Sequence, residues 1–129
     1  MLRQIPTLLL LTITFSSCLS LGDGSDTLIK ESSNRRYTKK AILFLRQSGA
    51  TVEDSYQVSV TNYENKFDTS QVGNAFTVDT NHGKTGLDST SINFSWLSDD
   101  ILQIDYDKQL QTFIRQTKID GVTIVYKAR

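Results

Sequence analysis

Short runs of alternating apolar and polar residues begin near Lys39 and continue to the end of the chain. Two of them, with single polar residues between the apolar ones, are Tyr56-Val58-Val60 and Ile92-Phe94-Trp96. Successive side chains on a strand point to opposite faces, so a period of two predicts strands with one buried and one solvated face. No βαβ alternation, internal repeat or heptad interrupts this pattern, which constrains the chain to an all-β fold.

Residues 41–45 are apolar on both faces, which predicts a central strand, and 75–79 predict a strand with Phe76 and Val78 inward. The Asn81-His82-Gly83 segment that follows is typical of a turn.

The strand at 92–96 is expected to form a hairpin with 101–106. The core face of the second strand carries Leu102, Ile104 and Tyr106. Asp120-Gly121 predicts a tight turn before a last strand at 122–126, because both positions tolerate positive φ. Residues 110–115 fit either a strand or a short helix.

The length of 129 residues leaves room for one domain. We therefore predict a small antiparallel meander or sandwich over residues 39–129. The chain has 14 basic and 14 acidic residues, a balance that argues against nucleic acid as a partner.

The N-terminus has the pattern of an export signal at 1–17. Arg3 supplies the positive charge, and an apolar stretch from Ile5 to Phe15 follows it. A membrane-spanning helix needs about 20 apolar residues, so this stretch is too short to span and is expected to be removed. This N-terminal segment could also be a plain secretory signal in which the cysteine has no role, or a buried apolar helix with a free thiol.

Cys18, the single cysteine, follows Phe15-Ser16-Ser17. This tetrapeptide resembles the lipobox of bacterial lipoproteins, with Phe where Leu is more frequent. The resemblance implies cleavage before Cys18 and acylation of its thiol and amine, which would anchor the chain to a membrane. The residue after the cysteine is Leu19. It is not the Asp that retains some lipoproteins at the inner membrane, so the outer membrane is expected.

Residues 18–38 are small, polar and charged, and they predict a flexible tether in which Leu28 and Ile29 could form a short helical turn. A basic cluster at its end could touch anionic head groups or simply be solvated at a strand entry. Its members are Arg35, Arg36, Lys39 and Lys40.

The segments SWLSDDILQIDYDK, GVTIVYK, GATVEDS and VDTNHG are similar to those of small bacterial envelope lipoproteins of uncharacterised function. The resemblance implies an exported β domain and transfers no catalytic residue.

His82 is the single histidine, so it could serve as a base beside Asp79 or beside Asp99 and Asp100, or it could be an ordinary turn residue. The acidic residues around the predicted hairpin at 92–106 could do acid or base catalysis as a pair, but they are better suited to solvated turns and strand ends. They are Asp99, Asp100, Asp105 and Asp107.

A weak oxygen-ligand metal site is conceivable at Asp79, Asn81 and Asp88, although the segment departs from a calcium loop by an early glycine. Trp96 is either a core anchor or an exposed platform for a sugar ring, and its phase favours the core.

Two functions remain open on these residues. The first is a lipid-anchored, non-enzymatic envelope module without a cofactor, whose β surface binds a protein, peptide or glycan. The second is a small hydrolase or metal-dependent enzyme that uses His82 with nearby Asp residues.

Overall fold

The computed structural model describes residues 25–47, 53–68 and 71–129, which form nine strands. In chain order the strands are β1 Ser25–Ser33, β2 Lys39–Gln47, β3 Ser55–Asn62, β4 Phe76–Asp79, β5 Ile92–Ser98, β6 Ile101–Tyr106, β7 Gln111–Arg115, β8 Lys118–Ile119 and β9 Val122–Ala128. The prediction of an all-β fold is confirmed. Over the described ranges, no helix has the length and apolar character to cross a membrane.

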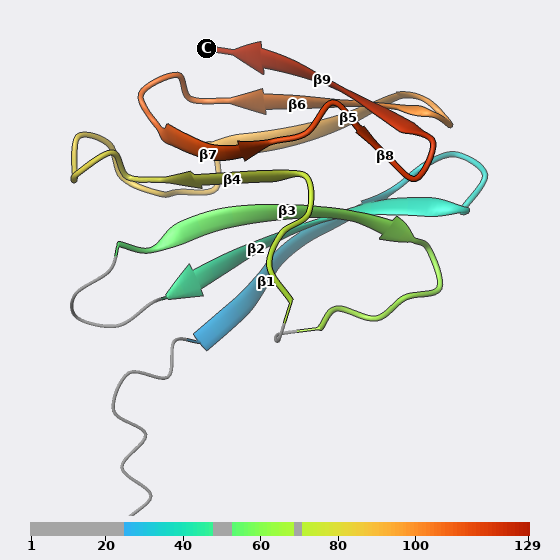
Figure 1. Cartoon of the computed structure of the whole chain (residues 1–129), viewed down its shortest axis with the longest axis horizontal. Helices are drawn as coiled ribbons and strands as arrows, with labels where there is room; N and C mark the ends of the chain where they lie inside the picture. Colours follow the sequence, from blue (N-terminus) through green and yellow to red (C-terminus); the bar gives the residue numbers. More distant parts are fainter. Residues whose placement is uncertain (1–24, 48–52, 69–70) are drawn as a thin grey trace, which may run out of the picture.

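The strands form two layers (Figure 1). One sheet has the order β1-β2-β3-β4-β7, and the other has the order β5-β6-β9-β8. All pairs are antiparallel except β6 with β9, which are parallel. This parallel pair departs from a simple meander, because β9 crosses back beside β6 after the chain has passed through β7 and β8.

The core lies between the sheets and combines side chains from both. On β6, the residues expected to face the core are buried, with exposed fractions of 0% for Leu102, 0% for Ile104 and 9% for Tyr106. Phe76 and Val78 of β4 are also fully buried in this cluster. The inward faces predicted from the period of two are therefore confirmed on these strands.

The strand at 39–47 is buried on both sides, as its apolar run predicts. Ala41 and Leu43 belong to the central core, whereas Ile42 and Phe44 face the segment that follows β3. The ring of Phe67 lies 5.2 Å from that of Phe44 and covers it. This face of the five-stranded sheet is thus partly covered by a loop.

Gln57 lies between Tyr56 and Val58, so the period of two would place its side chain on the solvated face of β3, but it is only 4% exposed. Its Oε1 accepts a hydrogen bond from Gly73 N at 2.8 Å, and its Nε2 donates to Ser55 Oγ at 3.0 Å. The same loop that covers Phe44 also crosses over this position. Burial of the amide is tolerated because its hydrogen bonds are satisfied.

The predicted tether over 18–38 is wrong for Ser25–Ser33, because these residues form β1. Leu28 and Ile29, which could have formed a short helical turn, lie within this strand. β1 pairs with β2 in antiparallel register, with a shift between Leu28 and Lys30. Its residues are largely exposed or half-buried, so they lack the alternation that signals a strand. The described part of the domain therefore begins before the predicted boundary at 39.

The two hairpin predictions are confirmed. β5 pairs with β6, and the Asp120-Gly121 turn joins β8 to β9 with φ of 49° and 78°. The ambiguous segment at 110–115 is a strand over its last five residues, β7.

Side chains also bridge the two sheets. Trp96 of β5 donates from Nε1 to the carbonyl of Ser32 on β1 at 3.0 Å. Tyr126 of β9 donates from its hydroxyl to the carbonyl of Ala75 at 3.2 Å and also contacts that of Gln116. Trp96 is half-buried against the core, as its phase predicts, so it is an anchor and not an exposed platform.

Candidate functional site

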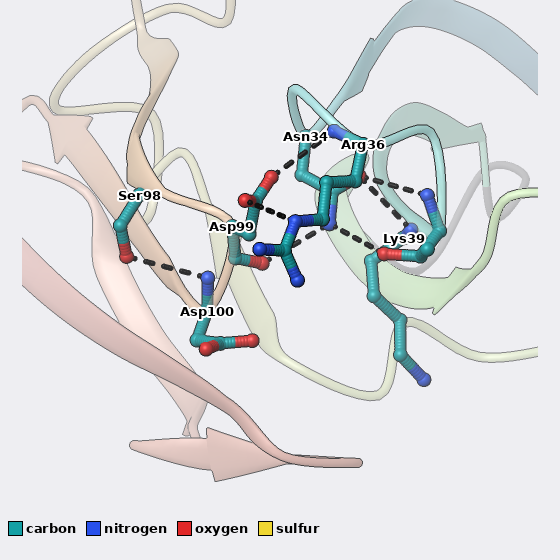
Figure 2. A network of polar contacts seen from close by, with 7 residues as sticks. Asn34, Arg36, Lys39, Ser98, Asp99 and Asp100 are labelled. Carbon is teal, nitrogen blue, oxygen red and sulfur yellow. Dashed lines mark hydrogen bonds and ion pairs between the residues drawn. The ribbon is translucent and has the colours of Figure 1, made fainter.

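A buried asparagine organises the turn between β1 and β2. Asn34 is 1% exposed. Its Oδ1 accepts from the backbone of Thr38 at 2.9 Å and of Lys39 at 3.2 Å, while its Nδ2 donates to Thr38 Oγ1 at 2.8 Å. The same Nδ2 donates to the carbonyl of Asp99 at 3.0 Å, which belongs to the β5–β6 turn (Figure 2). One side chain thus fixes one turn and joins it to the other sheet.

An ion pair strengthens this junction. Arg36 Nε lies 3.2 Å from Asp99 Oδ2, and Arg36 N donates to Asp99 Oδ1 at 3.0 Å. The Arg36 side chain is 78% exposed, so the ion pair itself contributes less than about 1 kcal/mol. Asp100 continues the turn by donating from N to Ser98 Oγ at 3.3 Å (Figure 2). Asp99 and Asp100 therefore form the turn between β5 and β6, and their contacts stabilise that turn.

The predicted basic cluster is spread over several contacts. Lys39 Nζ donates to Asn62 Oδ1 at 2.7 Å, and Lys40, which is 8% exposed, lies 3.5 Å from Glu31. Arg35 is exposed at the surface of the turn. The four cations therefore do not form one uniform patch.

His82 lies in a left-handed turn after β4. Asn81, His82 and Gly83 have φ of 52°, 58° and 78°, as their turn chemistry predicts. Glu53 Oε2 accepts from Thr80 Oγ1 at 3.0 Å and from the backbone of His82 at 3.3 Å. Glu53 Oε1 also lies 3.7 Å from His82 Nδ1. Glu53 was missed by the sequence interpretation, because it lies far away along the chain and belongs to no motif.

The structure does not bring His82 together with Asp99 and Asp100. The turn that holds His82 is tied to the end of β6, because Asn81 Nδ2 donates to the carbonyl of Gln109. Asp99 precedes the start of β6. The two turns therefore lie at opposite ends of β6 (Figure 1). A strand of six residues is about 17 Å long at the usual rise per residue, so the side chains of the two turns do not meet.

The side chains of Asp79, Asn81 and Asp88 are each held in local or turn contacts. Asp79 Oδ1 accepts from Asn81 N at 2.8 Å, and Asp88 Oδ1 accepts from Thr90 N at 2.8 Å and Thr90 Oγ1 at 2.6 Å. These hydrogen bonds lower the pKa of the Asp88 carboxyl. Among the described residues, no group of three His, Cys, Asp or Glu side chains is arranged to hold a metal ion.

The remaining acidic candidates also lie in local contacts. Asp105 accepts from Gln103 Nε2 at 2.8 Å, and Asp107 accepts from Gln109 N at 2.9 Å and from Thr85 Oγ1 at 3.4 Å. They stabilise the strand and turn around the end of β6.

A hollow that the sequence interpretation missed lies beside the β1–β2 turn. It has a volume of about 280 Å³. Its lining residues are Tyr37, Thr38, Asn62, Tyr63 and Glu64. The rings of Tyr37 and Tyr63 meet edge to face, with centroids 5.5 Å apart, although the residues are 64% and 44% exposed. The two tyrosines come from separate turns, so spacing along the chain does not reveal their contact.

A second groove lies on the covered face of the five-stranded sheet. It has a volume of about 270 Å³, and its apolar walls include Phe44 and Phe67. Asn74 forms part of its rim and is fixed to β3, because it accepts from Val60 N at 2.8 Å and donates to the carbonyl of Val60 at 2.9 Å.

The predicted lipid-attachment residue, Cys18, and the signal at 1–17 lie outside the described residues. No family model, curated protein or solved structure matches this chain.

Proposed function

We propose that this chain is a lipid-anchored protein of the bacterial cell envelope, held in the outer membrane through Cys18. Its β domain acts without catalysis and presents a surface to a protein, a peptide or a glycan. The proposal joins the lipobox-like Phe15-Ser16-Ser17-Cys18 at one end of the chain to the β sandwich at the other.

The observation that carries the proposal is the position of β1. The strand starts at Ser25, immediately after the seven residues from Cys18 to Gly24. Seven residues span at most about 25 Å even when fully extended. An acyl group on Cys18 would therefore hold the folded domain next to the membrane surface, a suitable position for a module that binds other envelope components.

The contacts of the polar side chains favour binding over catalysis. A general base must reach the proton that it removes, within a site that also holds the nucleophile. His82 has an 80% exposed side chain and its nearest carboxylate, Glu53, at 3.7 Å. Asp99, at the other end of β6, is held by Arg36 and the turn. These geometries support the hydrolase alternative less well than they support a binding module.

Replacement of the anchor residue tests the proposal. Cys18→Ser removes the thiol that would be acylated, so we expect the protein to leave the membrane fraction or to accumulate as an uncleaved precursor. Cell fractionation and immunoblotting measure both outcomes. The matched control is Ser17→Ala, which keeps a small residue before the cleavage point and should leave membrane association unchanged.

Membrane association of the Cys18→Ser protein equal to that of the wild type, with normal processing, would contradict the anchor. Loss of association in both variants would assign the effect to the signal as a whole and would equally contradict a specific role for the thiol.

A further inference from the structure

The hollow beside the β1–β2 turn combines features that a folded domain does not need for its own stability. Two tyrosines are exposed there, Tyr37 at 64% and Tyr63 at 44%, and both lie outside the hydrophobic core. Exposed aromatic side chains that line a concave surface are typical of ligand sites, where an apolar ring face and a polar tip are presented together.

The backbone of Tyr37 is held in an unfavourable conformation. Its φ is 57°, in the left-handed region that large side chains rarely adopt. Asn34 maintains this conformation, because its carbonyl accepts from Tyr37 N at 3.2 Å and its side chain holds Thr38. Backbone strain that surrounding contacts hold in place is found mainly at active and binding sites. The ring of Tyr37 is thereby positioned before any ligand arrives.

The partner ring is fixed independently. Tyr63 N donates to the carbonyl of Thr38 at 3.0 Å, so the end of β3 is tied to the same turn. The edge-to-face contact then sets the angle between the rings at 70°. Both aromatic walls are thus pre-organised, which lowers the entropy lost when a ligand binds.

Polar groups with unused hydrogen-bonding capacity complete the hollow. Asn62 Oδ1 is occupied by Lys39 Nζ at 2.7 Å, which orients the amide so that Nδ2 remains a donor. Among residues 25–47, 53–68 and 71–129, no hydrogen bond or ion pair engages that Nδ2 or the Glu64 carboxylate. The site therefore offers an amide donor and a carboxylate acceptor beside two aromatic rings.

We propose that this hollow binds a pyranose ring of an uncharged envelope glycan. A pyranose has an apolar C–H face, which suits an aromatic wall, and hydroxyl groups at its edge, which suit an amide and a carboxylate. The Glu64 carboxylate repels acidic sugars, and the nearby Lys39 ammonium is already engaged by Asn62 Oδ1 at 2.7 Å and by Asp120 Oδ2 at 3.9 Å, so an uncharged ring is preferred. This inference rests on the proposed function, since it identifies the ligand of the binding module, but it does not require the lipid anchor.

Titration of the full chain with two tetrasaccharides tests the site. One is β-1,4-linked glucose, and the other carries a 2-acetamido group on every ring; isothermal calorimetry gives each Kd. We expect at least one of them to bind. Tyr63→Ala should weaken that binding by about tenfold or more, the size typical of a well-seated aromatic contact.

Tyr37→Asn is the second variant, because asparagine tolerates the left-handed conformation and preserves the turn. It should lose binding to a similar extent while the protein melts at or near the wild-type temperature. The matched control is Phe113→Ala, which removes a 60% exposed aromatic side chain on β7 and should leave the Kd unchanged.

No measurable binding of either tetrasaccharide would overturn the inference. Equal binding by the wild type and both tyrosine variants would also overturn it, since the sugar would then lie elsewhere. Either result would leave the acylation of Cys18, which is measured separately, unaffected.

Discussion

Asn34 is the residue whose removal should most affect the junction between the two sheets. Its side chain makes four hydrogen bonds, to Thr38 N, Lys39 N, Thr38 Oγ1 and the carbonyl of Asp99. Asn34→Ala removes all of them at a position that is 1% exposed. The variant also leaves the backbone groups of a strained turn without their partners.

The expected loss follows from the individual bonds. A hydrogen bond contributes a net of about 0.5–1.5 kcal/mol, so four of them amount to about 2–6 kcal/mol. Thr38 is exposed, and water can replace part of the two bonds to it. We therefore expect the free energy of unfolding to fall by about 2–4 kcal/mol, a large fraction of the total for a domain of this size.

Urea unfolding of the full chain, followed by the fluorescence of Trp96, measures this change. The matched control is Asn65→Ala. Asn65 is an exposed asparagine with one side-chain hydrogen bond, to Thr61 Oγ1. That variant should change stability by less than about 0.5 kcal/mol. A loss below about 1 kcal/mol for Asn34→Ala, with an unchanged m-value, would refute the role assigned to Asn34.

Three further predictions concern other parts of the fold. Asp26→Ala removes an ion pair in which Arg46 Nε and Nη2 donate to the two carboxylate oxygens at 2.9 and 2.8 Å. Urea unfolding should show that the free energy of unfolding falls by about 1.5–3 kcal/mol, and a fall of less than about 0.5 kcal/mol would contradict this. Burial raises the pKa of Tyr126 to about 12 from the ordinary 10.0. Folding therefore favours its neutral form, and the resulting stability is complete below pH 10 and lost as the pH rises through 12. Phenolate absorbance should show an ionisation near pH 12, and the absence of this late ionisation would count against the burial of Tyr126. Gly73→Ala places a Cβ 2.8 Å from a β3 side chain and should lower the free energy of unfolding by about 1–3 kcal/mol. The Cβ added by Gly83→Ala has no atom within 4 Å, so this variant should lower the free energy of unfolding by only about 1 kcal/mol, through the φ of 78°. Equal melting temperatures for the two glycine variants would contradict the crowding at Gly73.

The strands with one buried face could be predicted from sequence because their burial has a period of two. β6 is the clearest example, with Leu102, Ile104 and Tyr106 inward and the residues between them half-buried. β1 could not be predicted in the same way. It lies at the edge of its sheet and is stabilised mainly by pairing with β2, so few of its side chains are selected for burial.

Contacts between segments that are distant along the chain could not be predicted from the sequence either. The parallel pairing of β6 with β9 depends on a crossover that no local pattern encodes. Gln57 is buried because a loop from later in the chain crosses over it. The Tyr37–Tyr63 contact likewise joins two turns that are separate in sequence. Local chemistry did predict the conformation of the turn at His82, but it could not predict that Glu53 lies beside it.

We propose that a lipid on Cys18 holds this β domain at a membrane. Mass spectrometry of the N-terminal peptide of the protein purified from its native membrane tests it most directly. We expect a peptide that begins at Cys18 and carries the added mass of the acyl chains. A peptide with an unmodified Cys18, or a mature chain that begins after it, would contradict the claim.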